Sequence, residues 1–150
     1  MRRFVNPGNT AFEVAVNSQI YVDKTGLLAY TNSVINTKQA LICSSRPRRF
    51  GKSITADMLC AYYSRGCDSD SIFASYEIAK SDSYKKHLNQ YDVIYLDIQW
   101  CMMDAGSAEQ TVSYLNYHVI EELKEIYPQI LLDGIRTAYG AMSCINAQTG

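Results

Sequence analysis

Apolar positions recur with a helical period in two stretches of the chain. In residues 54–63 the apolar side chains share one face, which predicts a helix that ends before Gly66. Residues 107–126 repeat this spacing, begin with a capping box at Ser107 and end at Pro128. Both stretches are therefore expected to be helices that pack one face against a core.

A basic segment leads into the first of these helices. Residues 46–53 read Arg-Pro-Arg-Arg-Phe-Gly-Lys-Ser and end like a phosphate-binding loop. Gly51 lets the backbone approach a phosphate, Lys52 supplies an ammonium for the β- and γ-phosphates, and the Ser53 hydroxyl can ligate Mg²⁺. The free N–H groups at the start of the helix point at the same anion. Arg46 stands where the general motif has its first glycine, so the match is incomplete.

Two further stretches have the composition of buried strands. Residues 39–45 form an apolar run before the loop, and residues 91–100 are rich in β-branched and aromatic side chains. Asp97 lies near the C-terminal end of the second run, where open parallel sheets bind ligands, and its carboxylate can hold Mg²⁺. This order of elements favours an α/β fold, P-loop NTPase-like, with a partial parallel sheet flanked by helices.

The expected organisation is a lead-in over residues 1–38 and a partial core over residues 39–150. A complete core of this kind needs about five parallel strands, and the pattern supplies two convincing ones. We therefore expect the chain to be the truncated amino-terminal part of a larger protein.

Composition and charge limit the partners. The net charge of −1 gives no global field that would draw nucleic acid. The basic residues of the 46–53 segment, however, have a density that suits a triphosphate or a nucleic-acid backbone. The five cysteines form no C-x-x-C pair. No apolar stretch approaches the roughly 20 residues of a membrane span, so we expect a cytoplasmic protein with free thiols.

Three segments resemble the amino-terminal part of the bacterial predicted AAA-ATPase-like family. They are residues 4–12, which begin Phe-Val-Asn-Pro-Gly-Asn, residues 21–28, Tyr-Val-Asp-Lys-Thr-Gly-Leu-Leu, and residues 45–53, which contain the loop. The Val-Ile-Tyr-Leu-Asp string that ends at Asp97 extends the likeness. The family shares the departure at Arg46. Its members often carry a second, nuclease-like domain of the PD-(D/E)XK type, so the resemblance implies such a partner in the parent protein.

The resemblance implies ATP binding with Mg²⁺, and ATP hydrolysis in the full-length parent. Many AAA proteins carry a glutamate directly after the metal-site aspartate to orient water, whereas Ile98 stands there in this chain. Gln99 would share a strand face with Asp97 and is the remaining candidate for that role. We therefore expect hydrolysis by this chain alone to be weak or absent.

Two alternatives stay open at this point. The chain could be a non-catalytic or degenerate module that binds a nucleotide or a partner, or its basic loop could bind a nucleic-acid backbone. Asp23 and Lys24 either contact the base or sugar or form a turn closed by a local Asp23–Thr25 hydrogen bond. The resemblance and the motif together give these expected site residues: Lys52 and Asp97 for catalysis, Ser53 and Asp97 for the metal, and Asp23, Lys24, Arg46, Arg48, Arg49, Phe50, Gly51, Lys52, Ser53 and Ile54 for the nucleotide.

Overall fold

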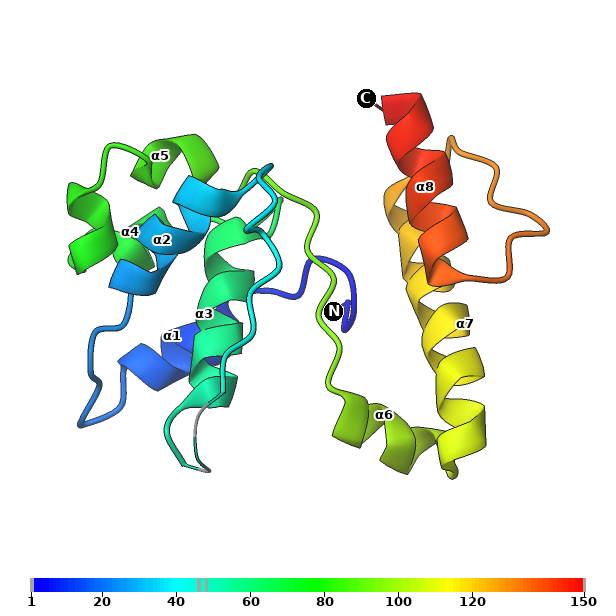
Figure 1. The fold of residues 1–150 in the computed structure, drawn as a ribbon, viewed down its shortest axis with the longest axis horizontal. Helices are drawn as coiled ribbons and strands as arrows, with labels where there is room; N and C mark the ends of the chain where they lie inside the picture. The colour runs from blue at the N-terminus through cyan, green and yellow to red at the C-terminus, as the bar shows by residue number, and fades with distance from the viewer. Residues whose placement is uncertain (1, 46, 48, 150) are drawn as a thin grey trace. The chain divides into compact units, whose positions relative to one another are not determined.

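The computed structural model describes residues 2–45, 47 and 49–149, and most of its regular structure is helical (Figure 1). The chain divides into two compact units, one of residues 6–93 and one of residues 2–5 together with 94–149. The first unit contains α1 (Thr10–Val16), α2 (Gly26–Val34), α3 (Lys52–Tyr63), α4 (Asp70–Phe73), the 3₁₀ helix η1 (Glu77–Lys80) and α5 (Tyr84–His87). The second contains α6 (Ile98–Ala105), α7 (Ala108–Ile126) and α8 (Ala138–Thr149).

The predicted α/β fold with a parallel sheet is wrong. Within the described ranges no strand forms, and β-pairing is limited to two isolated bridges, Val5 with Ile94 and Ser64 with Tyr91. Residues 41–45 belong to no helix or ladder, and Leu41 is 96% exposed. An apolar, β-branched run becomes a strand only where neighbouring strands pair with it and a core covers it, and the run itself does not supply those partners.

The second predicted strand ends in a helix instead. Asp97 has an extended backbone and its side chain accepts a hydrogen bond from the Trp100 N–H at 3.0 Å, which makes it the N-cap of α6. Aspartate is among the preferred N-cap residues because it satisfies one of the free N–H groups of the first turn. This local bond competes successfully with the strand propensity of the residues before it.

Aromatic packing holds the first unit together. Phe12 of α1 is fully buried and stacks on Phe73 at 5.1 Å between ring centroids, while Tyr62 of α3 meets Phe73 edge-on at 5.4 Å. Helix α3 confirms the predicted helix over residues 54–63 and buries Met58 and Tyr62, but Ile54, expected on the same face, is 38% exposed.

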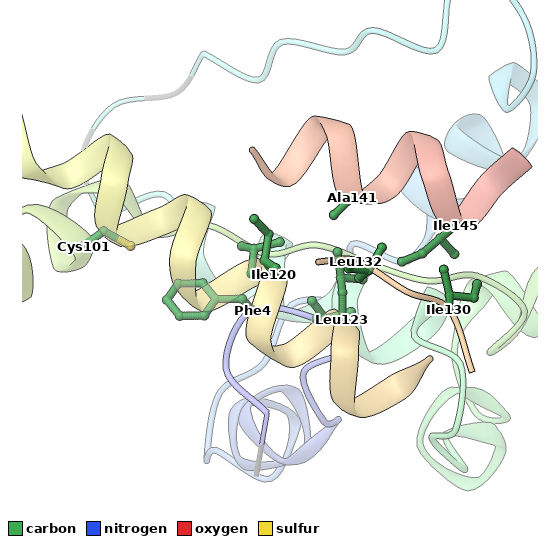
Figure 2. Close-up of a cluster of buried hydrophobic side chains, with 10 residues drawn as sticks. Phe4, Cys101, Ile120, Leu123, Ile130, Leu132, Ala141 and Ile145 are labelled. Atoms are coloured by element: carbon green, nitrogen blue, oxygen red, sulfur yellow. The ribbon is translucent and has the colours of Figure 1, made fainter. Parts of the chain in front are cut away.

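The second unit has its own apolar core between α7 and α8 (Figure 2). Helix α7 confirms the prediction over residues 107–126, and the Ser107 hydroxyl accepts a hydrogen bond from the Gln110 N–H at 3.3 Å. The buried side chains that Figure 2 labels are Phe4, Cys101, Ile120, Leu123, Ile130, Leu132, Ala141 and Ile145.

A carboxylate on α7 binds the amino-terminal segment of this unit. Glu122 accepts hydrogen bonds from the backbone N–H groups of Arg3, Phe4 and Val5 at 2.8, 2.9 and 2.7 Å. The Arg3 guanidinium lies 3.4 Å from the ring centroid of Trp100. These contacts add residues 2–5 to the core formed by the later helices.

The described helices include none that is both long and apolar enough to cross a membrane.

Candidate functional site

The predicted phosphate loop turns into α3 through a left-handed glycine. Gly51 has φ 73° and ψ 30° and is the N-cap of α3, so Lys52 and Ser53 are the first two residues of the helix. In the described part of the chain no side chain caps this helix, unlike α6 and α7. The Thr55 hydroxyl donates back to the Gly51 carbonyl at 3.0 Å and fixes the first turn. The start of α3 therefore offers N–H groups and a lysine to an anion.

The structure describes most of the other residues that were expected in the loop. Arg49 also has a left-handed backbone, with φ 68°, and Phe50 is 58% exposed. Lys52, Ser53 and Ile54 are exposed too. Arg46 and Arg48 lie outside the described residues.

Lys24 reaches the loop from the segment before α2. Its Nζ donates to the Phe50 carbonyl at 3.0 Å. A Cβ placed on Gly51 would lie only 2.7 Å from the same Nζ, so the ammonium fits against the glycine because no side chain is there. The structure thus brings Lys24 to Phe50 and Gly51, and a second lysine stands at the loop beside Lys52.

Asp23 forms the hydrogen-bonded turn that was one of its two expected roles. One carboxylate oxygen accepts the Thr25 N–H at 2.8 Å and the other accepts the Glu77 N–H at 2.9 Å. Burial would raise the pKa of Asp23, but these backbone hydrogen bonds and the charge of Lys80 hold the pKa below its ordinary value. Asp23 therefore fixes the turn that presents Lys24.

Asp97 belongs to the second unit, whereas the loop belongs to the first. One of its oxygens is engaged as the α6 N-cap. Gln99 lies inside α6, so its expected place on a strand face beside Asp97 is wrong. Among the described residues no group of three or more His, Cys, Asp or Glu side chains could hold a metal ion. The two oxygen ligands that the sequence predicted, Ser53 and Asp97, thus lie in different units.

A cleft that the sequence did not predict lies along α2 and α3 beside the loop. Its volume is about 520 Å³, and we call it the α2–α3 cleft. One of its lining residues, Glu77, lies in a polar stretch of the sequence that predicts a connecting loop. Neither the residue type of Glu77 nor its spacing from other polar residues marks it as a site residue. The lining residues are Asp23, Lys24, Gly26, Leu27, Thr31, Ile42, Cys43, Ser44, Thr55, Leu59 and Glu77.

A family model described as predicted AAA-ATPase matches residues 8–143, which include the loop, the 21–28 segment and Asp97. No curated protein and no solved structure matches the chain.

Proposed function

The chain belongs to the predicted AAA-ATPase family, and from this premise we propose that its loop binds the phosphates of Mg-ATP as the first step of ATP hydrolysis. One observation carries the proposal: Gly51 is left-handed at the uncapped start of α3, with Lys24 and Lys52 at the same loop. Uncapped helix N–H groups and ammonium groups together form an environment that favours a phosphate.

The basic residues have distinct roles in this proposal. Lys52 places its ammonium on the β- and γ-phosphates, as the lysine of a phosphate loop does. Lys24 donates a hydrogen bond to the Phe50 carbonyl, and an ammonium has three donors. It can therefore add a contact to the same phosphates while it supports the loop. Arg46, Arg48 and Arg49 supply guanidinium groups, which pair well with phosphate oxygens.

The donor chemistry of Ser53 and Asp97 fits Mg²⁺, because this ion prefers hydroxyl, carboxylate and phosphate oxygens. Ser53 has its hydroxyl in the first turn of α3, in the first unit, and Asp97 of the second unit has one carboxylate oxygen that does not cap α6. Bound Mg²⁺ supplies charge neutralisation at the β- and γ-phosphate oxygens. The residue after Asp97 is Ile98, so no carboxylate follows it to orient water. Nucleotide binding is thus the step that these residues support best.

The test is calorimetric titration of the chain with ATP, with and without Mg²⁺. Lys52→Ala should weaken Mg-ATP binding by about tenfold or more, because a charge-assisted contact to the phosphates is lost. Lys38→Ala is the matched control, since Lys38 is an exposed lysine outside the loop and should bind as the unaltered chain does.

Equal affinity in the folded Lys52→Ala and unaltered chains would refute the proposal. Salt-sensitive binding of DNA that ATP does not compete for would favour the nucleic-acid alternative instead.

A further inference from the structure

The α2–α3 cleft is continuous with the phosphate loop. Lys24 lines the cleft and donates to the Phe50 carbonyl of the loop. Thr55 lines it as well and donates to the Gly51 carbonyl. A ligand whose anionic end occupies the loop can therefore extend into the cleft past these two side chains.

Each helix lines the cleft with one leucine and one threonine, and both threonine hydroxyls donate to backbone carbonyls of their own helix start or turn. Leu27 and Thr31 are one turn apart on α2, and Thr55 and Leu59 are one turn apart on α3, so each pair lines the cleft from one helix face. Ile42 adds a branched apolar side chain from the segment before the loop. The volume of 520 Å³ lies within the about 300–1,000 Å³ of small-molecule sites, which are mainly apolar with a few polar groups.

A carboxylate supplies an acceptor in this cleft. A Glu77 oxygen lies 3.1 Å from the position of a Cβ on Gly26, so the carboxylate lies over the start of α2. The Glu77 backbone N–H is held by Asp23, which fixes the backbone of Glu77 independently of its side chain. An ionised carboxylate accepts hydrogen bonds only, so its partner must be a donor such as an amino group on a heterocycle.

We propose that the α2–α3 cleft binds the nucleoside part of an aminopurine nucleotide, with the base between the two helices and its amino group donating to Glu77. This inference rests on the proposed function, because the loop has to bind the phosphates of the same molecule. It adds a base-binding site and a specificity-determining residue, Glu77.

The first experiment separates nucleoside binding from phosphate binding. The full chain is titrated with Mg-ATP and with magnesium inorganic triphosphate, which has no nucleoside. Ile42→Trp should fill the cleft and weaken ATP binding by about tenfold or more, with triphosphate binding unchanged. Leu41→Trp is the matched control, because Leu41 does not line the cleft and is 96% exposed. It should leave both affinities unchanged.

A second titration tests Glu77. Glu77→Gln should weaken ATP binding by about three- to tenfold, the usual effect of losing a hydrogen bond to a charged group at a partly exposed site. The variant should bind purine riboside triphosphate, which lacks the amino group, as the unaltered chain does. Asp82→Asn, which removes an exposed carboxylate outside the cleft, is its control.

Cys43 gives an independent readout, because its side chain lines the cleft and is exposed while Cys60 and Cys101 are buried. ATP should slow iodoacetamide labelling of Cys43, measured by peptide mass spectrometry, whereas triphosphate should not.

The outcomes distinguish the two proposals. If ATP and triphosphate bind equally well, Ile42→Trp has no effect and Cys43 labels at the same rate with either, the cleft proposal is overturned and the loop proposal stands. If neither compound binds to the folded chain, both proposals fail.

Discussion

Replacement of Glu122 by alanine should destabilise the second unit more than the same replacement of an exposed glutamate on α7. The Glu122 carboxylate accepts three backbone hydrogen bonds, at 2.7–2.9 Å, from consecutive residues of the amino-terminal segment. Two of these donors belong to Phe4 and Val5, which are 3% and 0% exposed. Without the carboxylate, their N–H groups lose the partner that keeps them hydrogen-bonded inside the core.

The magnitude follows from the number and kind of these bonds. A hydrogen bond to a charged group contributes about 1.5–3 kcal/mol to stability, and a buried donor left without a partner costs about 1–3 kcal/mol. Because the three bonds share one carboxylate and are not additive, we expect a total loss of about 3 kcal/mol. Glu122→Gln keeps one acceptor oxygen but turns an amide donor toward backbone donors, so its loss should be intermediate.

The assay is urea unfolding followed by tryptophan fluorescence. Trp100 is the only tryptophan in the sequence and lies under the Arg3 guanidinium, so its emission reports on the region that Glu122 holds. A loss of about 3 kcal/mol should lower the urea midpoint by about 1.5 M. Glu125→Ala, at an exposed position on the same helix, is the control. Equal midpoints for the Glu122→Ala and Glu125→Ala variants would refute the reasoning.

Three substitutions in the first unit test its loop, its core and the turn at Asp23. Gly51→Ala combines left-handed strain of about 1–2 kcal/mol with a clash against the Lys24 ammonium. It should weaken Mg-ATP binding in calorimetry, whereas Gly66→Ala, with φ 84° and open space at its Cβ, should lose stability alone. Phe12→Ala should lower the free energy of unfolding by about 3–5 kcal/mol in denaturant titration; a loss below about 1 kcal/mol would mean that this ring is not central to the core. Because the pKa of Asp23 is lowered in the folded chain, its stabilising effect should be complete above its ordinary pKa of 3.8 and fade as the pH falls below it. The difference in melting temperature between the unaltered chain and Asp23→Asn should therefore shrink in acid, and a difference independent of pH would contradict this assignment.

Helices α3 and α7 were predictable because their signals are local. The period of α3 and the Ser107 cap of α7 act over neighbouring residues, and the structure contains both helices. Gly51 belongs to the same class, since a glycine before the lysine of a phosphate loop predicts an unusual backbone, and its φ of 73° agrees.

The predicted strands were wrong because strand formation depends on partners distant in sequence. The 39–45 run has the residue types of a strand, yet pairing and coverage come from elsewhere in a fold. In the 91–100 run a single local hydrogen bond, from the Trp100 N–H to Asp97, starts a helix where the apolar pattern predicted a strand.

The site was predictable where a motif marked it and not where only the fold assembles it. Lys24 was expected from the resemblance, and its contact with Phe50 brings it to the loop. Glu77 has no such signal, because the hydrogen bond from its backbone N–H to Asp23 links it to a residue far away in sequence. A side chain positioned by a hydrogen bond 54 residues away in sequence leaves no local pattern to find.

The three backbone hydrogen bonds to Glu122 affect the order in which the chain can fold during synthesis. Residues 2–5 are synthesised before their partner, which follows 117 to 119 residues later, so this part of the second unit can close only after Glu122 has been synthesised. Residues 6–93 form a continuous unit that can fold earlier. A fragment that begins at residue 94 would lack Phe4 and Val5 from its core.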